Sequence, residues 1–479
     1  MVTKTIVFSP FSRLEGDLEV KVDIEDGRIA RALASGTLYR GFELMLRGRD
    51  PLDAIVFTCR VCGQCGLSHS AASAAAIRAV TGAEMPRNAH LAINVMMAIE
   101  TILSHLTHFH LSFAPDLAEP PCGDATTQRF LPPAGRSFSR ALRAREEILG
   151  VLGLFAGKWP NTLAIQPGGT TRPVDASEIR RAYGLLNEFT EFIEQQIIGC
   201  EPDRWLAMRS ASDLEQWLGQ GAHEATDMGF FITQSLRRGL DRIGTWPARF
   251  ISSGGWAGPT GETLLKAGFH NGRAAAFAPG EIAEHVKHSW YDPHEGGVHP
   301  FEGESEPAPE RTGAYSWAKA PRYAGQPAEA GPLARMVNDR DPLVTDLLGK
   351  YGPSAFVREF ARLHEVIRLV YQVGQWLNEV DPEEPFYRDA GRAGSGSGVG
   401  LIEAPRGMLG HWIRVEDGRI LNYQIITPTG WNLSPRDSRD QPGPLEAALV
   451  GTPVPDSERP VEMSHVVKSF DPCLFCTVH

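Results

Sequence analysis

The sequence lacks a basic excess and a long apolar run. Its 479 residues include 47 Lys and Arg against 58 Asp and Glu, a formal net charge of -11. Nucleic-acid-binding proteins usually carry a basic surplus, so a nucleic-acid partner is not expected. The opening MVTKTIVFSPF lacks the features of a secretory signal, and no stretch reaches the roughly 20 apolar residues of a membrane span. We therefore expect a soluble, cytoplasmic chain with no direct membrane span, which would associate with a membrane only through partners.

Cysteine is also scarce, and its distribution is uneven. The seven cysteines are Cys59, Cys62, Cys65, Cys122, Cys200, Cys473 and Cys476. An odd count in a chain without a signal peptide argues against a disulfide framework. Five of the seven lie in two tight clusters, which indicates metal or redox chemistry. The three outside the C-x-x-C pairs, Cys59, Cys122 and Cys200, are expected to be packed thiols.

Apolar and polar residues alternate on both sides of two Asp-Gly turns. The segments LEVKVDIEDGRIARALASG and HWIRVEDGRILNYQII contain these turns, and each predicts a β-hairpin. Between the hairpins, apolar residues recur at helical spacing over residues 89–113, 137–155, 176–198 and 354–380. The sequence therefore predicts an α+β fold that is predominantly helical, with a large helical core and small sheet regions near both chain ends.

The composition changes only once along the chain. Residues from about 268 to 331 are rich in Gly, Pro, His and acidic side chains, which predicts a long irregular surface segment. No boundary would let the two ends fold independently, so we predict a single domain of residues 1–479.

The two C-x-x-C pairs are the residues most indicative of chemistry. Cys62 and Cys65 are followed by His69, and Cys473 and Cys476 by His479, the last residue of the sequence. On spacing alone, a structural zinc site, a catalytic or redox centre and inert buried thiols all remain open. The pairs are about 410 residues apart, whereas a zinc ribbon ties together a short segment. This separation favours a buried reactive centre that joins both chain ends.

The motifs around these pairs resemble the paired signatures of nickel-iron hydrogenase large subunits. The first runs from Arg60 through Cys62, Gly63 and Cys65 to His69, and the second is DPCLFCTVH at the C-terminus. FSRLEGDLEV, LYRGFELMLRGRDPLDA, PRNAH, EAPRGMLGHW and TPTGWNLSPRD extend the resemblance. The ending CTVH resembles the cytoplasmic uptake and dihydrogen-sensing groups. The resemblance implies a catalytic subunit that cleaves dihydrogen reversibly and heterolytically.

Metal ligands follow from the resemblance position by position. It implies that Cys62 and Cys473 are terminal nickel ligands, and that Cys65 and Cys476 bridge nickel to an iron that carries carbon monoxide and cyanide. Soft thiolates suit both metals, and the diatomic ligands need apolar walls and a few donors.

The resemblance also implies what surrounds the metals. Arg406 and Asp471 resemble a charged pair above the open metal face. Thr429, next to Pro428, resembles a hydroxyl donor to a cyanide, and His69 resembles a donor to a bridging thiolate.

A second metal and a proton acceptor are implied as well. Glu43, the carbonyl of Ile425 and the side chain of His479 match a site for magnesium, completed by waters. Without the resemblance, an ordinary helix-start carboxylate and a frayed terminus would explain Glu43 and His479. Glu15 matches the glutamate that receives the proton from the terminal thiolate Cys473. The local sequence alone favours an ion pair of Glu15 with Arg13.

Electrons have to leave through a partner, because no further cysteine cluster remains for an iron-sulfur centre. The resemblance implies an iron-sulfur small subunit, in a heterodimer that can assemble further, and maturation proteins that insert the metals. Two alternatives share the ancestry: a dihydrogen-sensing hydrogenase with slow turnover, and a metal-free electron-transfer scaffold. A zinc-binding structural protein is a third.

Four positions depart from the commonest family residues. Asp17, Lys468 and Ser104 stand where histidine, arginine and an acidic residue are common, and none of these changes removes a metal ligand. Gln64 stands where valine or isoleucine is common, near the gas entry to nickel. Its amide either hydrogen-bonds near the open site or turns to water, because a buried amide needs partners.

Overall fold

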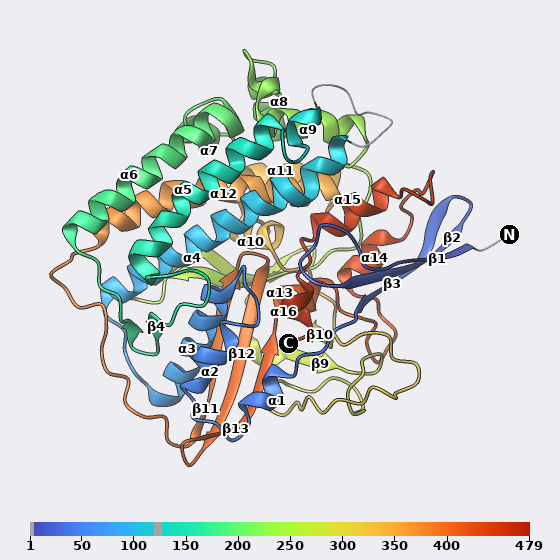
Figure 1. Cartoon of the computed structure of the whole chain (residues 1–479). Helices are drawn as coiled ribbons and strands as arrows, with labels where there is room; N and C mark the ends of the chain where they lie inside the picture. Colours follow the sequence, from blue (N-terminus) through green and yellow to red (C-terminus); the bar gives the residue numbers. More distant parts are fainter. Residues whose placement is uncertain (1–3, 119–126) are drawn as a thin grey trace.

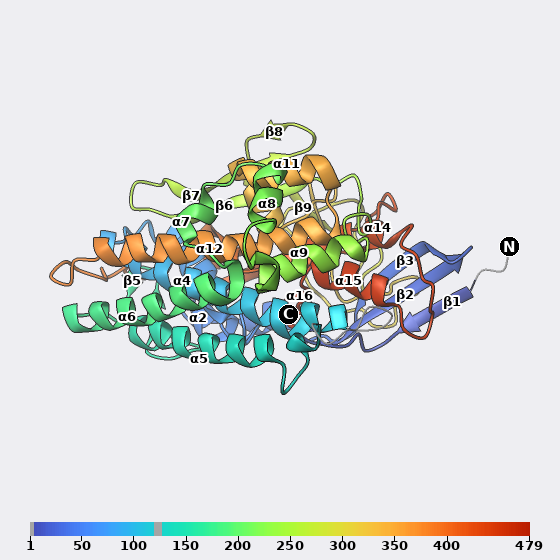
Figure 2. The same ribbon diagram turned by 90° about the horizontal axis from the view of Figure 1, so that it is seen from above.

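Four long helices pack side by side and form the larger layer of the molecule. The computed structural model describes residues 4–118 and 127–479. The long helices are α4 (Arg87–Thr107), α5 (Arg136–Ala156), α6 (Ala176–Phe192) and α12 (Ala355–Glu379) (Figure 1). Each has a neighbour among the other three, and they run side by side in the view from above (Figure 2). The four predicted helices are thus confirmed.

Helices α4 and α6 continue as π-helical turns, at His108–Phe113 and Ile193–Ile198. The shorter helices are α1 (Phe42–Leu46), α2 (Asp53–Thr58), α3 (Gly66–Thr81), α7 (Pro202–Leu206), α8 (Ala211–Leu218), α9 (Asp227–Arg237), α10 (Pro332–Asp339), α11 (Pro342–Tyr351), α13 (Pro428–Asn432), α14 (Pro444–Leu449), α15 (Val461–Ser469) and α16 (Leu474–Thr477).

Both predicted hairpins are present, each in a three-stranded antiparallel sheet. Strands β1 (Lys4–Phe8), β2 (Leu18–Glu25) and β3 (Arg28–Gly36) lie in this order, as do β11 (Gly396–Ala404), β12 (Gly407–Glu416) and β13 (Arg419–Ile426). At the first turn Asp26 and Gly27 have φ of 49° and 73°, and at the second Asp417 and Gly418 have φ of 50° and 72°. These positive values explain why Asp-Gly occupies both turns.

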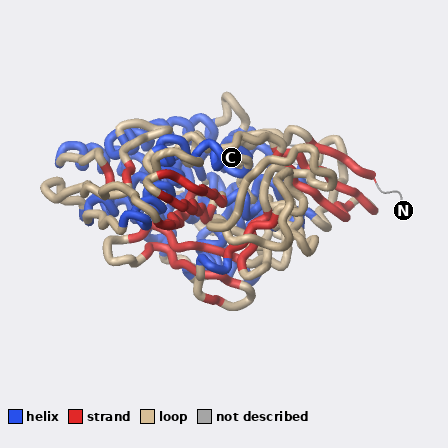
Figure 3. Tube along the Cα trace, turned by 90° about the horizontal axis from the view of Figure 1, so that it is seen from below, coloured by secondary structure: helices blue, strands red, loops and turns tan. Residues whose placement is uncertain are grey.

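Sheets also occur in the middle of the chain, where the sequence did not predict them. Strands β6 (Phe250–Ala257), β7 (Thr263–His270) and β8 (Ala274–Ala275) form one sheet. Two-stranded pairs are formed by β4 (Ile165–Gln166) with β5 (Gly169–Thr170), and by β9 (Ile282–His285) with β10 (Ala320–Tyr323). Seen from below, the molecule presents mostly strands and loops (Figure 3).

The segment 268–331 is largely irregular, but the expectation of a surface segment is wrong for its later part. Residues 318–323 and 327–331 are buried. Tyr323 belongs to a second apolar cluster with Trp412 and Trp431, and Arg322 pairs with Asp437 at 2.8 Å. A Gly- and Pro-rich composition predicts loops, but it does not reveal whether other elements cover them.

Helix α3 lies directly against strand β11 because small residues face each other. A Cβ at Gly398 would stand 2.1 Å from the carbonyl oxygen of Ala76, and one at Gly400 would stand 1.9 Å from that of Ala72. Only glycine permits such an approach. This packing holds α3 against the sheet, and the first cysteine pair lies just before this helix.

The two chain ends meet in the interior, where the C-terminus lies beside α13 and α16 (Figure 1). Glu15 forms a parallel bridge with Cys473, and the Leu474 amide donates to the Glu15 carbonyl at 2.7 Å. The N-terminal segment therefore forms part of the same site as the last residues.

Residues 87–118 form a helix that is long and apolar enough to cross a membrane, by length and composition alone. The expectation that no such stretch exists is therefore wrong. Within its most apolar window, 89% is buried inside the protein, so this helix belongs to the core.

Candidate metal centre

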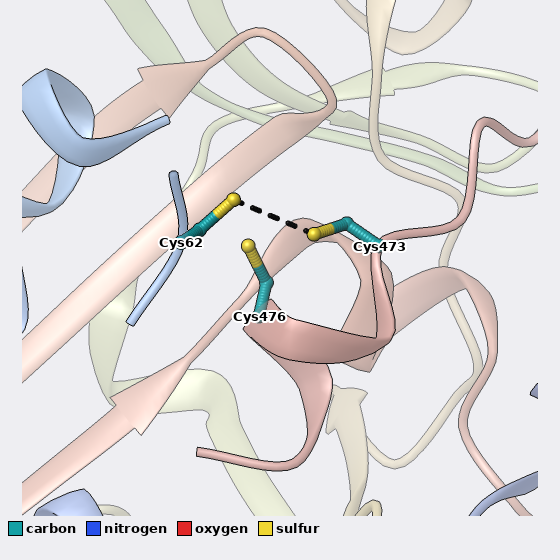
Figure 4. Close-up of side chains that lie close together, drawn as sticks. All are labelled: Cys62, Cys473 and Cys476. Atoms are coloured by element: carbon teal, nitrogen blue, oxygen red, sulfur yellow. Dashed lines mark hydrogen bonds between the residues drawn. The ribbon is translucent and has the colours of Figure 1, made fainter. Parts of the chain in front are cut away.

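Four cysteine thiols converge from the two ends of the chain. Cys65 directly precedes α3, and Cys473 directly precedes α16, which contains Cys476. The Sγ atoms of Cys62 and Cys473 are 3.5 Å apart, and those of Cys65 and Cys476 are 3.2 Å apart. Cys62, Cys473 and Cys476 point toward one another (Figure 4). None of the four is more than 4% exposed, and all four thiols are free.

The clustered thiols differ in how easily they ionise. Hydrogen bonds from Cys473 and the other two thiols hold the pKa of Cys62 well below its ordinary value. The same contacts, together with burial, raise the pKa of Cys476 well above it. One thiol thus ionises easily at the expense of its neighbours. Four thiolates together require metal cations, so this donor set fits a pair of soft metal ions.

His69 lies beside the second cysteine of each pair. A ring nitrogen of His69 is within 4.8 Å of the sulfurs of Cys65 and Cys476. Its Nδ1 is 3.1 Å from Nε2 of His411, while its Nε2 has no hydrogen-bond partner among the described residues. Burial lowers the pKa of His69 to about 3, so the imidazole is neutral. A neutral ring with one nitrogen held by His411 can donate from the other to a thiolate.

Arg406 and Asp471 form a buried ion pair next to the thiols. Arg406 Nε is 3.2 Å from Asp471 Oδ1 and donates to the Asp471 carbonyl at 3.0 Å. Burial opposes ionisation, but the Arg406 guanidinium and His108 hold the pKa of the Asp471 carboxyl well below its usual range. Arg406 Nη1 is buried without a partner in the described part of the chain. It therefore remains available as a donor.

Thr429 is tied to the backbone of a cysteine. Its Oγ1 accepts a hydrogen bond from the Cys473 amide at 3.1 Å. The hydroxyl therefore keeps its own hydrogen for another acceptor. Pro428, the first residue of α13, is buried beside it.

Glu15 does not pair with Arg13, which the structure joins to Asp116. Gln64 Nε2 instead donates to the Glu15 carboxylate, and Arg406 Nη2 donates to Gln64 Oε1 at 3.2 Å. Burial raises the pKa of the Glu15 carboxyl, although Arg406 lowers it. The Gln64 amide therefore hydrogen-bonds to two neighbouring side chains.

A cavity of ≈ 390 Å³ opens beside these groups. It is lined by Glu15, Gln64, Arg406 and Asp471, together with His108 and mostly apolar neighbours. The cavity therefore brings a titratable carboxyl and the buried ion pair to one space, beside the residue that precedes Cys473.

Glu43 and His479 also come together. His479 Nε2 lies 3.4 Å from Glu43 Oε1, which accepts from the Ile425 amide at 2.7 Å. Lys319 Nζ lies 3.3 Å from Glu43 Oε2 and 3.4 Å from Glu284. Burial opposes ionisation, but Lys319 and His479 lower the pKa of Glu43 to about 2. An ionised carboxylate and an imidazole fit a divalent cation in this place.

Some residues of the centre were not predicted from the sequence. His108 Nδ1 contacts Asp471 Oδ1 at 3.1 Å, and Lys319 joins the Glu43 site. The signal for His108 was a polar residue within an apolar helix; Lys319 lies in an irregular segment that offered none. Of the cysteines outside the pairs, Cys59 is buried and Cys200 half-buried, while Cys122 lies outside the described residues.

The comparisons with known proteins decide which metal family this is. The family profile described as nickel-dependent hydrogenase matches residues 40–119 and 134–479. The chain belongs to this family. The periplasmic NiFeSe hydrogenase large subunit of Desulfomicrobium baculatum is 31% identical, over 99% of this chain and 94% of its own length. The uptake hydrogenase large subunit of Rhodobacter capsulatus is 30% identical, over 99% of this chain and 95% of its own length.

Solved structures agree. The NiFeSe hydrogenase of Dm. baculatum is similar with a TM-score of 0.87 and 30% identity, covering 100% of both chains. That of D. vulgaris Hildenborough has a TM-score of 0.86 and 30% identity, also covering 100% of both chains. Although these enzymes are named for selenium, this chain carries cysteine at all four positions.

As a hydrogenase large subunit, the chain is an oxidoreductase that acts on dihydrogen. The predicted α+β fold and the predicted family are both confirmed. A structural zinc protein and a metal-free scaffold are excluded, because the family depends on nickel and all four cysteines are present.

Proposed function

We propose that the chain cleaves dihydrogen reversibly and heterolytically at a nickel-iron centre held by Cys62, Cys65, Cys473 and Cys476. The supporting observation is the convergence of four buried thiols from both chain ends, with Sγ separations of 3.5 and 3.2 Å. Cys62 and Cys473 would hold nickel, and Cys65 and Cys476 would hold both nickel and iron. When bound, the metals supply the Lewis acidity that polarises dihydrogen.

Three donors around the thiols suit the centre: Arg406 and Thr429 suit the diatomic ligands of its iron, and His69 suits a bridging thiolate. Arg406 Nη1 and His69 Nε2 are buried without partners among the residues described, and the Thr429 hydroxyl keeps its hydrogen. Cyanide is held by hydrogen-bond donors, while carbon monoxide needs an apolar wall such as Pro428.

The proton released from dihydrogen passes from the Cys473 thiol to Glu15. The backbones of the two residues form a parallel bridge, which brings their chain segments together, and Glu15 lines the 390 Å³ cavity; both observations support this route. A carboxylate within reach can take up the proton and release it again. Asp471 keeps the Arg406 guanidinium in place beside the thiols.

Magnesium is proposed at Glu43, His479 and the carbonyl of Ile425, with waters completing its shell. The approach of His479 Nε2 to Glu43 Oε1 at 3.4 Å supports it. The Lys319 ammonium close by would hydrogen-bond waters of the ion rather than bind it, because ammonium only donates. Such an ion would anchor the last residue and thereby the second cysteine pair.

An iron-sulfur small subunit is proposed as the electron-accepting partner in a heterodimer, and maturation proteins would insert the metals. The relatives are named large subunits, which supports a small partner. A cytoplasmic location stays a prediction, since one relative is named periplasmic. The choice between an uptake enzyme and a dihydrogen sensor also stays a prediction, which the turnover rate would decide.

The proposal is tested on the heterodimer purified without oxygen. We expect dihydrogen to reduce an artificial dye, and hydrogen-deuterium exchange with solvent to proceed without any acceptor. A heterolytic mechanism gives HD as the first product from D2 in light water. Loading with nickel and iron but no exchange would contradict it.

A further inference from the structure

Gln64 places an amide between an acid and a base at the edge of the metal centre. It precedes Cys65 and is half-buried, and its side chain lines the 390 Å³ cavity together with Glu15 and Arg406. Its Nε2 donates to the Glu15 carboxylate, and its Oε1 accepts from Arg406 Nη2 at 3.2 Å.

The two neighbours fix the orientation of this amide. An ionised carboxylate only accepts hydrogen bonds, and a guanidinium only donates them. The Gln64 nitrogen must therefore face Glu15, and its oxygen must face Arg406. Reversing the amide would break both bonds. The Gln64 amide thus bridges Glu15 and Arg406 in one allowed orientation.

The Gln64 amide separates two groups of opposite charge, the Glu15 carboxylate and the Arg406 guanidinium. In the part of the chain that the structure describes, no other group hydrogen-bonds the Glu15 carboxylate. Arg406 is fixed from its other side by Asp471, at 3.2 Å. Without the amide, the Glu15 carboxylate would be free to turn and pair with the Arg406 guanidinium. A carboxylate in such a pair holds a proton less readily and points away from its donor.

We infer that Gln64 is a positioning residue, which keeps Glu15 apart from Arg406 and oriented to take up the proton from Cys473. The inference rests on the proton route proposed above. It assigns the Gln64 side chain a role in proton transfer that differs from filling space: hydrogen bonding matters, and bulk alone does not suffice.

Gln64→Met separates these two roles. Methionine has nearly the length and volume of glutamine but cannot make either hydrogen bond. We expect the Met variant to keep its nickel and iron, the infrared bands of the iron ligands and the KM for dihydrogen. Hydrogen-deuterium exchange and kcat should fall about 10- to 100-fold, as misplaced catalytic groups do. Unchanged kcat and exchange would overturn the inference. A changed KM alone would also overturn it, because it would show that the side chain only limits the access of dihydrogen.

Gln64→Leu serves as the second variant if the Met variant does not load metals. Leucine is apolar and makes neither hydrogen bond. Exchange should fall as in the Met variant. Exchange at the wild-type rate in a metal-loaded Gln64→Leu protein would overturn the inference.

A double variant ties the effect to Glu15. If Gln64 acts through Glu15, adding Gln64→Met to Glu15→Gln should cause no further loss of exchange. A further loss of the same size as in the wild-type background would overturn the inference. The failures are distinguishable: normal exchange in Glu15→Gln refutes the proton route itself, whereas a defect in Glu15→Gln with normal exchange in Gln64→Met refutes only the role of Gln64.

Discussion

Glu15 lies opposite Cys473 in a parallel bridge, so a residue near the start of the chain is hydrogen-bonded to the segment that carries the last two cysteines. The Glu15 carbonyl accepts from the Leu474 amide at 2.7 Å. Its side chain is thereby carried to the cavity beside Arg406. Changes in the N-terminal segment should therefore be detected at the metal centre.

Glu15→Gln should preserve the metals, the infrared bands and the fold, while dihydrogen oxidation and exchange with solvent fall by orders of magnitude. An amide of the same shape cannot take up and release the proton at accessible cost. Exchange is measured by mass spectrometry of HD and H2 from D2. Glu19→Gln, on the neighbouring strand β2, is the matched control and should exchange normally. Normal exchange in Glu15→Gln would show that the proton leaves by another route.

Gly16→Ala should weaken the contact between the chain ends. Gly16 has φ of 85°, and a Cβ there would stand 3.1 Å from the Leu474 side chain and 3.2 Å from the Phe475 amide nitrogen. The strain is about 1–3 kcal/mol. We expect less nickel per chain and a lower melting temperature. Gly153→Ala, in helix α5 with open space around it, should leave the nickel content unchanged and should not lower the melting temperature, since alanine is the better helix former. Equal nickel contents in the two variants would show that this approach is not needed.

Cys473→Ser should abolish dihydrogen activation and nickel retention, because a hydroxyl of high pKa cannot replace a soft thiolate. The same holds for Cys62, Cys65 and Cys476. Cys200→Ala, at a half-buried thiol away from the cluster, should keep its metals and activity. Nickel content and dye reduction are measured on the same preparations. A Cys473→Ser protein with full nickel and normal activity would refute the ligand assignment.

Asp341 provides a test of stability against pH, independent of the metals. Burial would raise its pKa, but hydrogen bonds and charges from His364, Val344 and Arg368 lower it to about 2. Its stabilising contribution is therefore complete above the unfolded pKa of about 4 and is lost as the pH falls toward 2. Asn keeps the helix cap but not the charge.

Asp341→Asn should accordingly lower the free energy of unfolding by about 1–2 kcal/mol at pH 7. The difference from wild type should shrink between about pH 4 and pH 2. Thermal unfolding across this range measures it. A difference that stays constant with pH would show that the charge of Asp341 does not stabilise the fold.

The sequence predicted the fold correctly in segments where apolar residues recur with a single spacing, either that of a strand or that of a helix. The hairpins at Asp26 and Asp417 and the helix around Ala355–Glu379 follow from alternation, turn residues and helical spacing. Strand β6 (Phe250–Ala257) was missed, because its burial does not alternate and glycines interrupt it. Helix and hairpin signals lie within the segment itself, whereas such a strand is defined by its neighbours.

The site, like the fold, could be predicted where the signal lies within a short stretch of sequence. The cysteine pairs stand out by spacing, and their surroundings follow from the family motifs. The contacts of Lys319 with Glu43 and of His108 with Asp471 join residues hundreds of positions apart, and no local pattern encodes them. The partners of Gln64, Glu15 and Arg406, are likewise distant in the sequence and are adjacent only in the folded chain.

The most direct test is the metal content and infrared spectrum of one oxygen-free preparation of the heterodimer. The four-thiolate assignment predicts about one nickel in this chain, and iron beyond the amount in the small subunit's clusters by about one atom. It also predicts infrared bands of carbon monoxide and cyanide, which no protein group supplies. Zinc in place of nickel, or nickel without these bands, would contradict a nickel-iron centre at the four cysteines.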